Sequence, residues 1–174
     1  MPSDDRLKNY VQDGRKLLAG NDTLYDIIVG DAYYSLFSVP IHLTTKEFFT
    51  LAKNRLAPNG VFVGNFVGYL DNQGPSFIGS EIKTFKNVFE NSYFFAVRSA
   101  QTSNSQNIIF MGINGPKKID FQSPAIVKNT NPILRDLEQK NINTTGFDFS
   151  KHKELTDNYA PVEYLVSKII NRWH

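Results

Sequence analysis

The sequence predicts an α/β fold with an open, doubly wound, mostly parallel sheet and an antiparallel strand pair near its C-terminal edge. Apolar strands alternate with amphipathic helices along the chain, which implies right-handed crossovers onto one sheet. The strand expected at 25–31 has an unbroken apolar centre, which is typical of a central strand covered on both faces. The connection between the strands expected at 93–98 and 107–113 is too short for a crossover helix, so these two must pair antiparallel.

The first elements follow from turn signals and apolar runs. Residues 7–12 have the pattern of a short strand that ends at Asp13-Gly14. Residues 15–19 predict one or two helical turns, which Gly20-Asn21 ends. The clearest strand is 25–31, with the sequence Tyr-Asp-Ile-Ile-Val-Gly-Asp.

The next helix and strand are marked by their ends. Thr44 or Thr45 is a suitable N-cap, because a hydroxyl oxygen can accept a hydrogen bond from the first helical turn. The helix is expected to run to about Leu56 and to stop before Pro58, since proline cannot continue it. Residues 61–67 then form a second buried-looking strand.

The remaining elements are read from periodicity. Residues 77–89 place apolar side chains on one face at helical spacing. The antiparallel strands at 93–98 and 107–113 follow. A helix is predicted at 132–140 and a terminal helix at 161–173.

Composition excludes several classes of protein. A chain of 174 residues with 41% hydrophobic and 21% charged residues is expected to form a single globular domain. The net charge of +2 gives no footprint for nucleic acid. Cysteine is absent, and the histidines have no paired carboxylates at ligand spacing, so we expect no metal site. No apolar run is long enough to span a bilayer, and we expect a cytoplasmic protein.

Candidate site residues lie where the strands end, because ligands of open α/β sheets bind beyond the carboxyl ends of the strands. Asp13-Gly14 follows the first strand, and its alternative interpretation is a plain Asp-Gly turn. Asp31 ends the central strand, where its carboxylate can hold an amine cation and act as a general base. Its alternative is a helix cap or a loop-closing salt bridge. Tyr33 either lines a slot over a ligand or belongs to the core.

Five motifs in this order resemble the spermidine synthase-like proteins, most closely a branch often fused to membrane transporter domains. The motifs are Asp-Gly-Arg at 13–15 and the segments 25–33, 40–49, 56–61 and 155–165. The resemblance is close over 4–65 and in the C-terminal motif, and general over 68–150. It implies a partial class I methyltransferase-like Rossmann fold.

The resemblance also implies an activity and a co-substrate. Family members transfer an aminopropyl group from decarboxylated S-adenosylmethionine to an amine such as putrescine, with no permanently bound cofactor and no metal. By analogy, Asp13 accepts a hydrogen bond from the adenine amino group and Gly14 contacts the ring. Ala32 is expected beside them in the co-substrate site.

The acceptor side is assigned in the same way. Asp31 would hold and deprotonate the attacking amine. Tyr33 and Tyr159 would line the amine slot, Tyr159 as the tyrosine of a late Tyr-x-Pro motif. A second acidic residue, typical of the family shortly after the catalytic aspartate, is missing here, which puts specificity for diamines in question.

The family pattern also has parts with no counterpart in this sequence. These are an N-terminal β-hairpin domain, a first strand with its Gly-rich turn, and a second strand with a ribose-binding acid. We therefore interpret residues 1–174 as the C-terminal part of an N-terminally truncated aminopropyltransferase domain. Two strands would be left with unpaired edges, which is costly. The edges would be covered by a complementing N-terminal polypeptide or a homo-oligomer, or the strands would re-pair, or the sequence is a fragment of a longer product.

Three functional hypotheses remain open on the sequence. The first is an aminopropyltransferase acting on a small-molecule amine and a nucleoside sulfonium, inactive without its missing part. The second is an S-adenosylmethionine-dependent methyltransferase relative, since the fold is shared. The third is a non-catalytic interaction module or remnant, favoured by the lost nucleotide loop.

Overall fold

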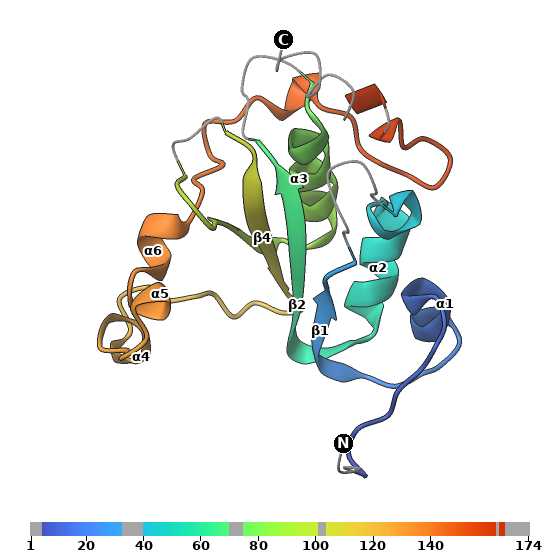
Figure 1. The fold of residues 1–174 in the computed structure, drawn as a ribbon, viewed down its shortest axis with the longest axis horizontal. Coiled ribbons are helices and arrows are strands. Elements are labelled where there is room, and N and C mark those ends of the chain that lie inside the picture. The colour runs from blue at the N-terminus through green and yellow to red at the C-terminus, as the bar shows by residue number, and fades with distance from the viewer. Residues whose placement is uncertain (1–4, 33–39, 70–74, 101–103, 163, 166–174) are drawn as a thin grey trace.

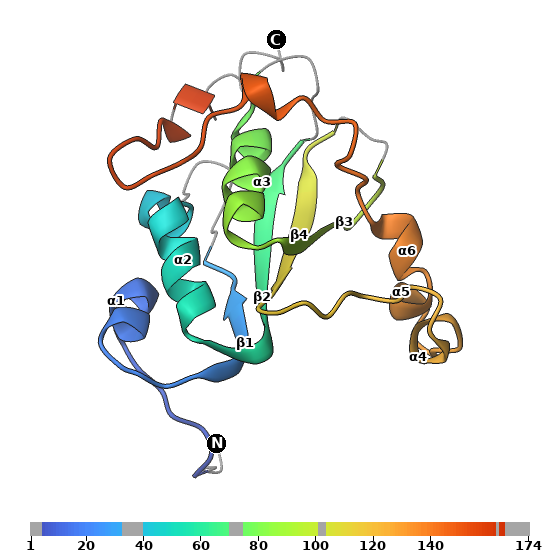
Figure 2. The same ribbon diagram turned by 180° about the vertical axis from the view of Figure 1, so that it is seen from behind.

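The computed structural model describes residues 5–32, 40–69, 75–100, 104–162, 164 and 165. Four strands form one sheet in the order β1-β2-β4-β3. Helices α2 and α3 pack side by side on one face of this sheet, and α1 lies beyond α2 near the edge formed by β1 (Figures 1 and 2).

The sheet confirms the predicted α/β class and refines its topology. β1 (Tyr25–Gly30) runs parallel to β2 (Leu56–Gly68). β4 (Gln106–Ile113) is antiparallel to β2 and also to β3 (Asn91–Ala96). The predicted antiparallel pair is therefore present, but β4 is inserted between β2 and β3. Three strands share one direction, and β4 alone of the described strands opposes them.

Helix positions follow the capping residues. The α-helices are α1 (Gly14–Ala19), α2 (Lys46–Asn54), α3 (Phe77–Val88), α4 (Pro124–Val127), α5 (Pro132–Arg135) and α6 (Leu137–Lys140), and short 3-10 turns span Ile41–Leu43 and Phe149–Lys151. Thr45 caps α2 by accepting a hydrogen bond from the Phe48 amide, as predicted. Ser76 caps α3 in the same way.

The predicted turn before β2 is a bulge inside the strand. The register with β1 jumps at this point, so residues 57–60 loop out before Val61 resumes regular pairing. Asn59 has a positive φ of 62°, which asparagine tolerates better than most residues. A Cβ on Gly60 would lie 2.9 Å from two carbonyl oxygens, so glycine is required there.

Several predicted elements are wrong or only partly described. Residues 7–12 are not a strand, and the side chains of Tyr10 and Val11 are exposed. No described strand lies beside this segment to pair with it. The helix expected at 132–140 is divided into two single turns at Asp136, whose φ of −96° and ψ of 18° leave the helical range. Most of the helix expected at 161–173 lies outside the described residues.

The core is aromatic and lies between the sheet and helices α2 and α3. The ring centroids of Phe49 and Phe85 are 5.1 Å apart, and those of Phe66 and Phe110 are 4.2 Å apart. All four rings are buried, and most contacts are tilted or edge-on, as aromatic pairs prefer. This packing fixes α2 and α3 on β2 and β4.

β1 does not have the double coverage that its apolar sequence predicts. Tyr25 and Ile28 pack against the core, but Ile27 is 62% exposed and Val29 is 68% exposed. Among the described strands, β1 is an edge strand paired only with β2, and helices α2 and α3 lie on one face of the sheet (Figures 1 and 2). A continuous apolar strand therefore presents an open edge and an open face to water.

Candidate functional site

A pocket of about 450 Å³ runs along β1, between this strand and helix α1. Three of the residues predicted for the site line it together: Gly14, Asp31 and Ala32. The rest of the lining is mostly apolar and comes from α1, β1 and the core: Leu17, Leu18, Tyr25, Ile27, Ile28, Val29, Gly30, Leu43, Phe48 and Phe62. An apolar pocket with a few polar groups at one end is the usual form of a small-molecule site.

Asp31 stands at the carboxyl end of β1 and is exposed. The Asn65 amide of β2 donates a hydrogen bond to Asp31 Oδ1 over 3.0 Å. Asn107 of β4 in turn donates to Asn65 Oδ1 over 2.9 Å. A row of polar side chains thus crosses three adjacent strands at one edge of the sheet and orients the Asp31 carboxylate.

Asp13 is the N-cap of helix α1. Its Oδ1 accepts a hydrogen bond from the Lys16 amide over 2.9 Å, and its Oδ2 lies 2.8 Å from His42 Nε2. The Lys16 amide and then the His42 ring hold the pKa of the Asp13 carboxyl below its usual value. Asp13 borders the side of α1 away from the main pocket, with His42, whereas Gly14 lines the pocket itself.

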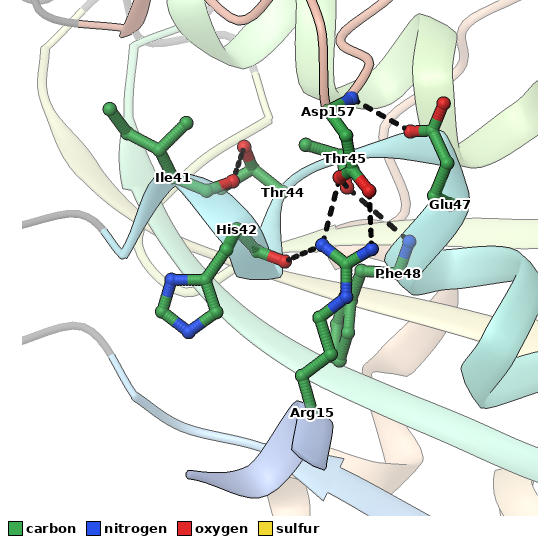
Figure 3. A network of polar contacts seen from close by, with 8 residues as sticks. All are labelled: Arg15, Ile41, His42, Thr44, Thr45, Glu47, Phe48 and Asp157. Carbon is green, nitrogen blue, oxygen red and sulfur yellow. Dashed lines mark hydrogen bonds and ion pairs between the residues drawn. The ribbon is translucent and has the colours of Figure 1, made fainter. Parts of the chain in front are cut away.

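Arg15 links this turn to the far end of the sequence (Figure 3). Its guanidinium donates to both carboxylate oxygens of Asp157, over 2.8 Å and 2.5 Å, and also to the His42 carbonyl oxygen over 2.9 Å. Hydrogen bonding to Asp157 raises the pKa of Arg15 and lowers the pKa of Asp157. A bidentate pair of this kind fixes orientation as well as distance.

Asp157 also sits at the start of helix α2. The Thr45 hydroxyl donates to Asp157 Oδ1 over 2.7 Å, and the Asp157 amide donates to Glu47 Oε2 over 2.9 Å (Figure 3). The Lys46 amide donates to the Leu155 carbonyl over 2.8 Å. The late segment therefore satisfies free donors at the helix N-terminus, where a carboxylate is favoured by the helix dipole.

The two predicted tyrosines have different outcomes. Tyr159 closes a tight turn with Thr156, each donating its amide to the other's carbonyl over 3.0 Å. Its side chain is 53% exposed and is not part of the pocket lining. Tyr33 lies outside the described residues. The amine-side roles of both tyrosines stay predictions.

Sequence reasoning missed Arg15, Asp157 and Asn107 as members of this region. Arg15 follows the Asp-Gly pair directly and Asp157 lies in the late motif at 155–165, but neither was assigned a role. The two lie 142 positions apart, and no local pattern encodes a pairing over that distance.

Within the described ranges, no three His, Asp or Glu side chains cluster as metal ligands would, and no helix there is long and apolar enough to span a membrane.

The sequence is similar to that of known proteins over most of its length. No protein-family model matches the sequence. The chain is 28% identical over 180 residues to a probable polyamine aminopropyl transferase of Bifidobacterium longum, covering 94% of this chain and 39% of the relative. The chain therefore spans less than half of that protein's length.

Solved structures give the same relationship. A probable spermidine synthase from Corynebacterium glutamicum aligns with a TM-score of 0.60 and 27% identity, covering 74% of this chain and 45% of that one. Human methyltransferase-like protein 13 aligns with a TM-score of 0.55 and 22% identity, covering 95% of this chain and 69% of that one, which supports the fold alone. The chain therefore has a partial methyltransferase-like Rossmann fold and is similar to the spermidine synthase-like proteins.

Proposed function

We propose that this chain forms the amine-activating part of a polyamine aminopropyltransferase site. The observation that carries the proposal is the pocket beside β1, which Gly14, Asp31 and Ala32 line together. Its apolar walls suit the faces of an adenine ring, and its polar end carries a carboxylate at the edge of the sheet where ligands of such folds bind. The similarity to aminopropyltransferases supports the assignment of chemistry.

The proposed reaction needs a base and positioning rather than a metal. Asp31 binds the protonated amine and takes its proton, which frees the nitrogen lone pair. The nitrogen attacks the aminopropyl carbon next to the sulfonium; a C–N bond forms as the C–S bond breaks, and its electron pair neutralises the sulfur of methylthioadenosine. The Asn65 amide, bonded to Asp31 Oδ1, orients the carboxylate toward the amine.

Decarboxylated S-adenosylmethionine is the proposed co-substrate, bound between α1 and the end of β1. Gly14 and Ala32 offer backbone groups to the adenine there. The contact of Asp13 with the adenine amino group stays a prediction, because Asp13 borders the other side of α1 from this pocket and its oxygens are bonded to Lys16 and to His42. Tyr33 and Tyr159 are proposed on the amine side.

We propose that the open edge of β1 pairs with a complementing polypeptide that supplies the rest of a complete site. The support is the exposure of Ile27 and Val29 on an edge strand that has one sheet neighbour, together with the 39% span of the relative. Exposed apolar edges are strongly disfavoured unless they are covered. A homo-oligomer is the alternative cover. A cytoplasmic location and a single domain over 1–174 stay predictions.

A methyltransferase relative is the second candidate. The observation that favours it is the absence of the second acid after Asp31, which leaves diamine binding without its usual partner. A non-catalytic interaction module is the third, and the exposed edge of β1 favours it.

One pair of assays separates the three candidates. The chain, alone and co-expressed with the unmatched part of the Bifidobacterium longum relative, is incubated with putrescine and either decarboxylated or ordinary S-adenosylmethionine. Methylthioadenosine formation that Asp31→Asn abolishes is the expected result for the co-expressed pair. A methylated product would favour the second candidate, and no turnover in either preparation would favour the third.

For the isolated chain, we expect only weak binding of methylthioadenosine, because in this proposal the complementing part would supply the rest of the site. Calorimetry at neutral pH measures this directly. Micromolar binding to the purified chain would contradict the dependence on a complementing part.

A further inference from the structure

The pair formed by Arg15 and Asp157 joins helix α1 directly to the late turn of the chain. Arg15 belongs to helix α1, whose first residue Gly14 lines the pocket. Asp157 belongs to the late turn that ends at Tyr159. The contact between them spans 142 positions, so it fixes a relationship that chain connectivity leaves open.

The geometry of this contact is restrictive. Both guanidinium nitrogens that face Asp157 are bonded to separate carboxylate oxygens, over 2.8 Å and 2.5 Å (Figure 3). A planar fork held at two points allows little rotation, in contrast to the single point contact of a lysine. The third donation, to the His42 carbonyl, ties the segment before α2 to the same guanidinium.

The far side of Asp157 is equally constrained. The Thr45 hydroxyl donates a hydrogen bond to Oδ1, which also accepts from Arg15, and the Asp157 amide donates to Glu47 Oε2. Thr45 is buried and Phe48, in the first turn of α2, is part of the aromatic core. The late turn is therefore anchored on a helix that cannot move without disturbing the core.

We propose that Arg15 and Asp157 form a latch that positions the late turn, and with it Tyr159, relative to the Gly14 end of the pocket. Both are positioning residues: neither lines the pocket, and they act through the turn and through α1. This inference rests on the proposed function, because the latch would keep the nucleoside side and the amine side of the proposed site at a fixed separation.

A distance measurement tests the latch without any substrate. The chain has no cysteine, so spin labels at Ala19→Cys, the last residue of α1, and at Asn158→Cys, in the late turn, are the only labels present. Both positions are exposed. Pulsed electron resonance of the full labelled chain should give one narrow distance distribution.

Asp157→Asn and Arg15→Met should each replace that narrow peak with a broad one, because each removes the two-point contact. Asp136→Asn, which breaks the Arg135–Asp136 ion pair elsewhere on the surface, is the matched control and should leave the peak unchanged. A residue that only adds stability would not alter the distance between the labels in folded molecules. Because unfolded molecules would also broaden the distribution, circular dichroism checks that each variant is folded.

A broad distribution in the otherwise unsubstituted labelled chain, or a narrow one in both latch variants, would overturn the proposal. Transferase activity plays no part in this readout. A chain without activity but with a latch-dependent narrow distance would contradict the proposed function while supporting the latch.

Discussion

The core under α2 and α3 and the edge formed by β1 are stabilised by different interactions. Under α2 and α3, Phe49, Phe62 and Phe85 fill the space with rings 5.1–5.9 Å apart, and all three are buried. Along the edge of β1, Ile27 and Val29 face water and the nearby structure is held by hydrogen bonds and ion pairs. The difference indicates that this chain contains its own core but leaves one boundary of the candidate site open.

The largest effect is expected in the aromatic core. Phe49 is fully buried and contacts four other phenylalanine rings, so Phe49→Ala should lower the free energy of unfolding by about 3–5 kcal/mol. Urea denaturation followed by circular dichroism measures the loss. Val29→Ala, on the open face, is the matched control and should change the free energy by less than about 0.5 kcal/mol. Equal losses at the two positions would remove the contrast between the regions.

An intermediate effect is expected at the latch. Asp157→Asn removes a charge that pairs with Arg15 and lies at the N-terminus of α2, and should cost about 1 kcal/mol at neutral pH. Because the folded-state pKa of Asp157 is lowered, its contribution is complete above the usual value of 3.8 and is lost as the pH falls through the lowered pKa.

The pH dependence of this variant can be checked by thermal unfolding. The gap between the unsubstituted chain and Asp157→Asn should be constant from neutral pH to about pH 5 and should close under more acidic conditions. A gap that widens as the pH falls would show that the carboxylate is not stabilised by its partners.

The sequence predicted the scaffold better than the boundary. Caps and breakers such as Thr45 and Pro58 act locally, so the start of α2 and the regular part of β2 could be located in advance. The bulge inside β2 was not predicted. The apolar run of β1 was interpreted as buried on both faces. An apolar sequence favours burial, but it does not show whether a strand or helix is present to cover it. The strand predicted at 7–12 was wrong because no described strand lies beside that segment to pair with it.

The candidate site was predictable at the end of β1. Asp31 and Ala32 follow this strand and line the pocket, as the topology rule expects. Gly14 lines the same pocket from the start of α1, because residues 7–12 are not a strand. The Arg15–Asp157 contact was not predictable, since a pairing over 142 positions depends on tertiary packing. The histidines were considered only as metal ligands, so the contact of His42 with Asp13 was not predicted either.

The smallest effect on stability is expected at the open edge. Val29→Lys should leave the free energy of unfolding of the isolated chain within about 0.5 kcal/mol, because the side chain is already in water. The same change should abolish co-purification with a complementing polypeptide, since a charge would then lie in the new interface. Affinity pull-down after co-expression measures the interaction, and Lys128→Ala serves as a distant control. Unchanged recovery of the partner would place its binding site elsewhere.

The central claim is that the pocket beside β1 binds the nucleoside at its Gly14 and Ala32 end. Titration of the ¹⁵N-labelled chain with methylthioadenosine, followed by two-dimensional NMR, detects even millimolar binding residue by residue. We predict saturable shifts of the Gly14, Asp31 and Ala32 amides, with the amides of α5 and α6 unchanged. Shifts confined to other parts of the surface, or none at the solubility limit of the ligand, would contradict the claim.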